Sequence, residues 1–193
     1  LPISLIHGVE SFTSKNAYPM TDMLACRAIE LIAANIRTAY ANGQDLSARS
    51  HMLEGSLLAG MAFANAGVTA VHAFAYPIGA EFHIPHGVAN SIMLASVMEF
   101  NMLGNLKKFA QMAALLGENT AGMSERQMAL ATVQALRTLS ADLQIPNHLS
   151  QFGVKATDIP MLAEGVMKVT RLLANNPRVM TQKDAERIYL SVL

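Results

Sequence analysis

The chain has 193 residues, of which 52% are hydrophobic and 15% are charged, and its fourteen basic residues balance its fourteen acidic ones. A neutral chain lacks the basic surface that binds nucleic acids or anionic membranes, and no run of about 18 apolar residues predicts a membrane-spanning helix. The single cysteine, Cys26, excludes an internal disulfide, and no secretory signal pattern opens the chain, so we expect a cytoplasmic location.

The first half of the chain begins with two predicted amphipathic helices. From Thr21 to Asn42, apolar side chains recur at three- and four-residue spacing, and Gly43 is placed to end this helix. Asp45 can cap a second helix that runs from about Leu46 to Asn65. Both segments are long enough to contribute one apolar face to a core.

The middle of the chain holds two further helices separated by a break. Thr69 opens a helix that we expect Pro77 and Gly79 to interrupt, because proline lacks the N–H that continues a helix. Beyond the break, the run from Val88 to Met102 predicts another apolar helix, followed by a shorter one. The HIPHG segment, residues 83–87, is then expected to change the direction of the chain before the second of these helices.

The last third of the chain carries the clearest helix-start signals. Ser124 and Gln127 have the spacing of a capping box and start a helix that ends before Pro146. Asp158 precedes another helix, and Thr181 is placed to cap the last one.

The pattern as a whole predicts an all-α domain. Segments in which apolar and polar residues alternate are missing, so we expect no sheet. We expect about eight to ten helices, with residues 1–193 as one unit. Because so few residues are charged, part of the apolar surface should face another domain or subunit, and we expect a homo-oligomer. The first residue, Leu1, is not Met, which indicates a processed chain or part of a longer one.

Three of the six histidines lie in one stretch, HAFAYPIGAEFHIPHG, residues 72–87. His72 is placed in an apolar helix whose neighbouring side chains cannot hydrogen-bond its ring, so it needs a partner from elsewhere. His86 follows the turn at Pro85 and should open the next helix. Two imidazoles brought together across a turn are one way to build a transition-metal site, although their spacing alone defines no regular ligand motif.

A longer segment, GMAFANAGVTAVHAFAYPIGAEFHIPHGVANSIML, closely resembles the signature of the iron-containing (group III) alcohol dehydrogenases. The resemblance continues through LSADLQIPNHL and ANNPR to the last helix, so it covers the whole chain. It matches only the C-terminal, all-helical half of that family, which is dehydroquinate synthase-like. The family's N-terminal α/β half, with its glycine-rich nucleotide-binding loop, is absent from this chain.

The resemblance implies a divalent metal, iron or sometimes zinc, held by one aspartate and three histidines. Carried onto this sequence, the histidines are His7, His72 and His86, and the aspartate falls on Ile3. Residues four apart share a helix face, so the family arrangement supplies an anion and an imidazole from one turn, and Ile3 removes the anion. Three neutral imidazoles can still hold zinc with water, but the oxygen ligand that suits iron is lost, so we expect weak or absent metal binding.

The resemblance also implies roles for two aromatic residues. Tyr76 stands where the family commonly has another histidine close to the nicotinamide and the substrate. It is either a catalytic and cofactor-binding residue or a tyrosine that packs at the helix end with its hydroxyl in water. Phe63 falls on a position that lines the substrate pocket, although core packing explains a Phe there equally well. His83 is expected beside the site or on the surface, and Glu10, without a visible partner, on a solvated face.

The sequence therefore predicts the metal- and substrate-binding half of an NAD(P)-dependent alcohol dehydrogenase that interconverts a primary alcohol and an aldehyde by hydride transfer. In the family mechanism the metal acts as a Lewis acid on the substrate oxygen. We expect NAD(P) to bind only with the missing N-terminal half, so this chain alone should be inactive. The alternative, favoured by Ile3 and Tyr76, is a metal-free helical domain with a structural or assembly role. A further possibility is a full-length parent enzyme with an altered metal requirement.

Overall fold

The computed structural model describes residues 2–193, and within that range it contains helices and no strand. The α-helices of this range are α1 (Ile3–Thr13), α2 (Pro19–Ala41), α3 (Leu46–Ala66), α4 (Ala70–Phe82), α5 (His86–Asn101), α6 (Leu106–Leu115), α7 (Glu125–Asp142), α8 (Ile159–Lys168), α9 (Thr170–Asn175) and α10 (Gln182–Leu190). Short 3₁₀ turns lie at Met102–Gly104, Leu149–Phe152 and Ala156–Asp158. The prediction of an all-α fold with eight to ten helices is confirmed.

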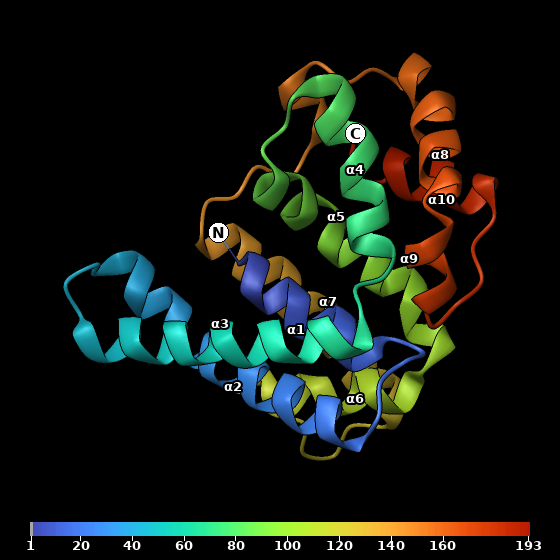
Figure 1. The fold of residues 1–193 in the computed structure, drawn as a ribbon. Coiled ribbons are helices and arrows are strands. Elements are labelled where there is room, and N and C mark those ends of the chain that lie inside the picture. Colours follow the sequence, from blue (N-terminus) through green and yellow to red (C-terminus); the bar gives the residue numbers. More distant parts are fainter. Residues whose placement is uncertain (1) are drawn as a thin grey trace.

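Two groups of helices meet at α1. Helices α2 and α3 run side by side and project to one side of the molecule, with α1 packed against both (Figure 1). Helices α4, α5, α8 and α10 pack together at the other end (Figure 1). The largest fully buried side chains come from both groups and from α6: Tyr189, Phe12, Phe74, Phe109, Leu5, Ile6, Ile29, Ile32, Ile78, Met93, Leu94 and Met98. The core therefore runs across α1, which places this helix at the centre of the fold.

The predicted helix starts are confirmed where a polar side chain supplies the cap. The Asp45 carboxylate accepts a hydrogen bond from the N–H of Ala48 at the start of α3. Ser124 and Gln127 form the capping box of α7, and Thr181 caps α10. These caps satisfy N–H groups that have no partner within the helix, which explains why local sequence was enough to find them.

The predicted break at Pro77 and Gly79 is wrong, because α4 continues through both residues to Phe82. Proline costs the helix one hydrogen bond, but tertiary contacts support the backbone here. The buried hydroxyl of Tyr189 donates to the carbonyl of Phe74 at 2.7 Å. On the other side Pro77 packs so closely on α8 that a Cβ added at Gly165 would lie 3.0 Å from the proline ring. The chain turns only at His83, in the left-handed conformation (φ 55°).

Part of the apolar surface expected from the composition lies on α3. Leu46, Leu53, Leu57 and Met61 are exposed, and their spacing of seven and four residues places them on one face of the helix. For residues 2–193, no single helix is both long and apolar enough to cross a membrane; α3 and α4 meet that test only when taken together across a 99° bend. This α3 face is the surface most suited to contact another domain or protomer.

Helix α10 yields a stability prediction. The Thr181 hydroxyl donates to the Asp184 carboxylate at 2.6 Å, and this bond, with the Thr181 N–H and the nearby Arg187, holds the pKa of Asp184 below its ordinary value. A lowered pKa stabilises the fold above the unfolded-state pKa of about 3.9, and this stability is lost as pH falls through the folded-state value. Asp184→Asn should therefore lower the free energy of unfolding by about 0.5–1 kcal/mol at pH 7.

Urea denaturation at pH 7 and at pH 3.5 checks this prediction. The difference between Asp184→Asn and the wild type should shrink at the lower pH, where the wild-type carboxyl group begins to bind a proton. An equal difference at both pH values would contradict it.

Candidate metal centre

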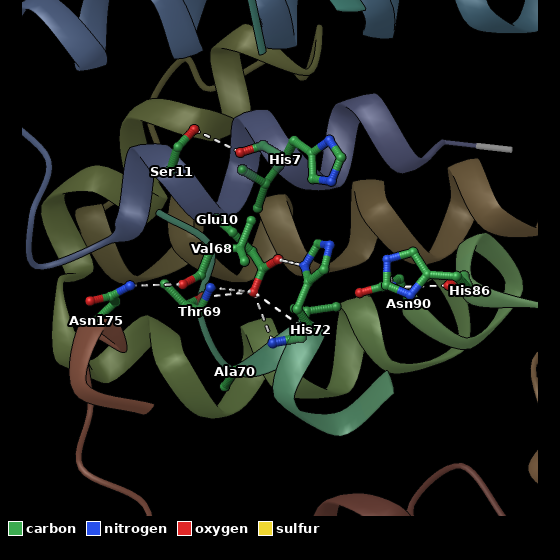
Figure 2. A network of polar contacts seen from close by, with 12 residues as sticks. His7, Glu10, Ser11, Val68, Thr69, Ala70, His72, His86, Asn90 and Asn175 are labelled. Carbon is green, nitrogen blue, oxygen red and sulfur yellow. Dashed lines mark hydrogen bonds and ion pairs between the residues drawn. The ribbon is translucent and has the colours of Figure 1, made fainter. Parts of the chain in front are cut away.

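Three separate helices, α1 and the consecutive pair α4 and α5, each place one histidine in the same region. His7 lies on α1, His72 lies in the first turn of α4, and His86 is the first residue of α5. The ring centres of His7 and His72 are 5.1 Å apart, and those of His72 and His86 are 5.2 Å apart (Figure 2). The three residues expected to be ligands are therefore neighbours, with His72 in the middle; that they bind a metal stays a prediction.

Glu10 lies behind this cluster, and the prediction that it faces solvent is wrong. Its side chain is fully buried, at 0% exposure. One carboxylate oxygen, Oε1, accepts hydrogen bonds from the N–H groups of Thr69 and Val71, each at 2.9 Å, and from the Thr69 hydroxyl at 2.8 Å. The other oxygen, Oε2, contacts Nδ1 of His72 (Figure 2). Burying a carboxylate is costly unless such donors surround it, so this network explains where Glu10 lies.

One sequence signal could have pointed to Glu10. It stands three residues after His7 on α1, and residues three apart lie on the same side of a helix. A histidine and a glutamate on one helix face, followed by an apolar helix that contains a histidine, is compatible with a shared buried site. The signal is weak without the fold, because it does not show that the start of α4 packs against that face.

The two outer histidines are neutral near pH 7. Burial lowers the pKa of His7 to about 4, with His72 acting in the same direction and Glu10 opposing it. The pKa of His86 is also lowered, first by burial and then by His72. A neutral imidazole keeps one unprotonated ring nitrogen, which is the form that binds metal ions.

Asn90 adds a polar group beside His86. Its amide nitrogen donates to the backbone carbonyl of His86 at 2.9 Å and lies 3.3 and 3.2 Å from the two ring nitrogens. Asn90 is fully buried, and its side-chain oxygen Oδ1 accepts no hydrogen bond from any residue in the described part of the chain. Buried polar atoms are nearly always paired, so this acceptor marks the cluster as a place suited to a further polar group.

The donor set fits a zinc ion by type. Two imidazoles bound tetrahedrally, with Zn–N distances of about 2.1 Å, have ring centres roughly 5 Å apart, which matches the His7–His72 and His72–His86 distances. As the side chains stand, however, no three His, Cys, Asp or Glu residues within 2–193 form a group that could hold a metal ion. Ile3, at the expected aspartate position, is half-buried and packs against the core. Binding therefore requires the rings to turn and another ligand to complete the site.

Phe63 and Tyr76 both lie at the edge of the cluster. The Phe63 ring centre is 4.5 Å from that of His7, and the Tyr76 ring centre is 6.1 Å from that of His86. Tyr76 is 42% exposed and also lines a cavity of about 370 Å³ between α4 and α8. Their positions are compatible with a substrate pocket, while their roles in it stay predictions. His83 caps the C-terminus of α4.

Comparisons with known proteins give the family. The model of the C-terminal region of the Fe-containing alcohol dehydrogenase family matches residues 4–193. The chain is 45% identical over 186 residues to a 1,3-propanediol dehydrogenase from Citrobacter freundii, covering 96% of this chain and 48% of the relative. It is 35% identical over 190 residues to an NAD-dependent methanol dehydrogenase from Bacillus methanolicus, covering 98% and 50%.

Comparison of the fold with solved structures gives the same family. A solved structure of a 1,3-propanediol oxidoreductase matches with a TM-score of 0.96 at 43% sequence identity, over 98% of this chain and 50% of that one. This chain thus spans about half the length of the relatives that it matches. It belongs to the Fe-containing alcohol dehydrogenase family and corresponds to the C-terminal, helical region of its members.

Proposed function

We propose that this chain supplies the metal- and substrate-binding half of an NAD(P)-dependent alcohol dehydrogenase that interconverts a primary alcohol and an aldehyde. The observation that carries the proposal is the meeting of His7, His72 and His86 from three separate helices. The names of the relatives support it, since they include a 1,3-propanediol dehydrogenase and an NAD-dependent methanol dehydrogenase.

The ring nitrogens of His7, His72 and His86 would hold a divalent ion, with zinc preferred to iron because Ile3 supplies no oxygen ligand. When bound, such an ion polarises the oxygen of an alcohol or aldehyde as a Lewis acid. Phe63, packed against the His7 ring, would provide an apolar wall for the carbon chain of the substrate. Tyr76 would donate or accept a hydrogen bond at the open side, next to His86.

The other half of the site would come from the N-terminal region that the longer relatives have. NAD(P) is proposed to bind mainly there, so the 193-residue chain alone should not oxidise alcohols. The exposed apolar face of α3, with Leu46, Leu53 and Leu57, supports a contact with that region or with a second protomer. A cytoplasmic homo-oligomer is part of the same proposal.

A chimaera tests the proposed function. The N-terminal half of the Citrobacter freundii 1,3-propanediol dehydrogenase, fused to this chain, should catalyse NAD(P)-linked oxidation of short primary alcohols when supplied with zinc or iron. Chelation should abolish the activity, and His7→Ala should reduce it by about 100-fold or more, because one of the metal ligands is lost. His148→Ala, at an exposed histidine outside the cluster, is the matched control. A folded chimaera that binds metal and cofactor but turns over no alcohol would overturn the proposal.

A second candidate is a metal-free domain with a structural role. Ile3 favours it, and so does the lack of a ready metal-binding group within residues 2–193. Under this alternative, Glu10 and His72 would serve only to join α1 to α4. Zinc binding to the purified chain distinguishes the two candidates.

A further inference from the structure

Glu10 caps a helix that is not its own. Helix α4 begins at Ala70, and its N-cap residue, Thr69, makes no side-chain cap bond. The first N–H groups of a helix have no partner within it, and the positive end of the helix dipole favours an anion there. Glu10, which belongs to α1, accepts hydrogen bonds from the N–H groups of Thr69 and Val71 and places its carboxylate at the positive end of α4. Its carboxylate is therefore held at a fixed place, directly beside the ring of His72.

We propose that Glu10 is a positioning residue that fixes the tautomer of His72. Oε1 of Glu10 already accepts three hydrogen bonds from the start of α4, and Oε2 contacts Nδ1 of His72, so the geometry assigns the proton of this contact to Nδ1. In the neutral ring the electron pair is then on Nε2. Figure 2 shows this second nitrogen turned away from Glu10, toward the region between His7 and His86.

This role rests on the proposed function, in which that electron pair is offered to a metal ion. A carboxylate that accepts from the far side of a ligand imidazole holds the ring in place and makes the metal-binding nitrogen more basic. Glu10 is the carboxylate that contacts the cluster, while Ile3 leaves no carboxylate at the family's position. Through His72, Glu10 thus supplies part of the negative charge that the site would otherwise lack.

The tautomer can be measured without any metal. The chain would be labelled with ¹⁵N-histidine, freed of metal by a chelator and studied at pH 8, above the ordinary histidine pKa of about 6.5. Long-range ¹H–¹⁵N spectra distinguish a protonated ring nitrogen from an unprotonated one, and the His72→Gln variant identifies the His72 signals. We expect a proton on Nδ1 and none on Nε2. A proton on Nε2, or on both nitrogens, would overturn the proposal.

The Glu10→Gln variant tests whether Glu10 is what sets the tautomer of His72. A glutamine can keep its oxygen toward the N–H groups of Thr69 and Val71, but its amide then donates to Nδ1 of His72. The ring proton should move to Nε2, the nitrogen proposed to face the metal, and zinc affinity should fall by about 10- to 100-fold. Glu54→Gln, the same change at an exposed position of α3, is the matched control. A folded Glu10→Gln protein with the wild-type tautomer would refute the assignment.

The two proposals fail in different ways. If the metal-free wild-type chain has the proton on Nδ1 but binds no zinc, the positioning role stands and the proposed function fails. If zinc binds to the wild type, and Glu10→Gln binds it equally well with the tautomer reversed, the proposed function stands and Glu10 has no role in it. Circular dichroism of Glu10→Gln, compared with the wild type, shows that the overall helix content is kept.

Discussion

Zinc added to the purified, metal-free chain should bind at about one ion per chain, and His72→Ala should weaken this binding by roughly 100-fold or more. His72 lies between His7 and His86, with ring centres 5.1 and 5.2 Å away, so its loss removes the central ligand. Elemental analysis after exposure to excess zinc gives the stoichiometry. Competition with a coloured chelator gives the affinity.

His72→Ala has a second effect, because it leaves the buried Glu10 carboxylate without the ring it contacts. His7→Ala and His86→Ala avoid this complication, since no hydrogen bond joins either ring to Glu10 among residues 2–193. Both should also lower zinc affinity, whereas His148→Ala should not. A wild-type chain that takes up no zinc under zinc-replete conditions would contradict the prediction and favour the metal-free alternative.

Ile3→Asp should tighten metal binding by about 10- to 100-fold and improve the binding of iron(II) relative to zinc. Ile3 and His7 stand four residues apart on α1, so an aspartate at position 3 would lie on the same helix face as the His7 ring. It would add an oxygen ligand and a negative charge to three neutral imidazoles, and iron(II) gains more than zinc from an oxygen donor. Competition titrations with both metals measure the change.

Ile3→Asn is the matched control for this substitution. It removes the same apolar side chain and introduces a polar one of the same shape as aspartate, but it adds no charge. If Asp and Asn give equal affinities, or if neither changes the wild-type value, then position 3 does not face the metal and the alignment of α1 with the family is wrong.

The helices could be predicted from sequence because their signals are local. Apolar spacing and the caps Asp45, Ser124 and Thr181 act within a few residues of the helix they start. Proline usually interrupts a helix, but at Pro77 the helix continues because Tyr189 on α10 and Gly165 on α8, both distant in sequence, pack against it. The sequence around Pro77 contains neither of these residues.

The histidine cluster could not be predicted from local signals. His7 stands 65 positions before His72, so spacing could not join them, and the resemblance to a family supplied the grouping. The resemblance implies roles for the metal ligands and none for Glu10. The burial of Glu10 depends on α4 beginning beside α1, which is a property of the assembled fold.

Glu10 contacts both the start of α4 and the ring of His72, so the presence of His72 in a related sequence is not by itself a sign of metal binding. The carboxylate binds the start of α4 and the His72 ring together, so removing either partner leaves buried polar groups unpaired. Selection for a stable fold alone would therefore keep both residues, even in a chain that had given up its metal. Among sequences of this kind, positions 3 and 7 report on the use of a metal ion, whereas the Glu10–His72 pair reports first on how α1 and α4 are joined.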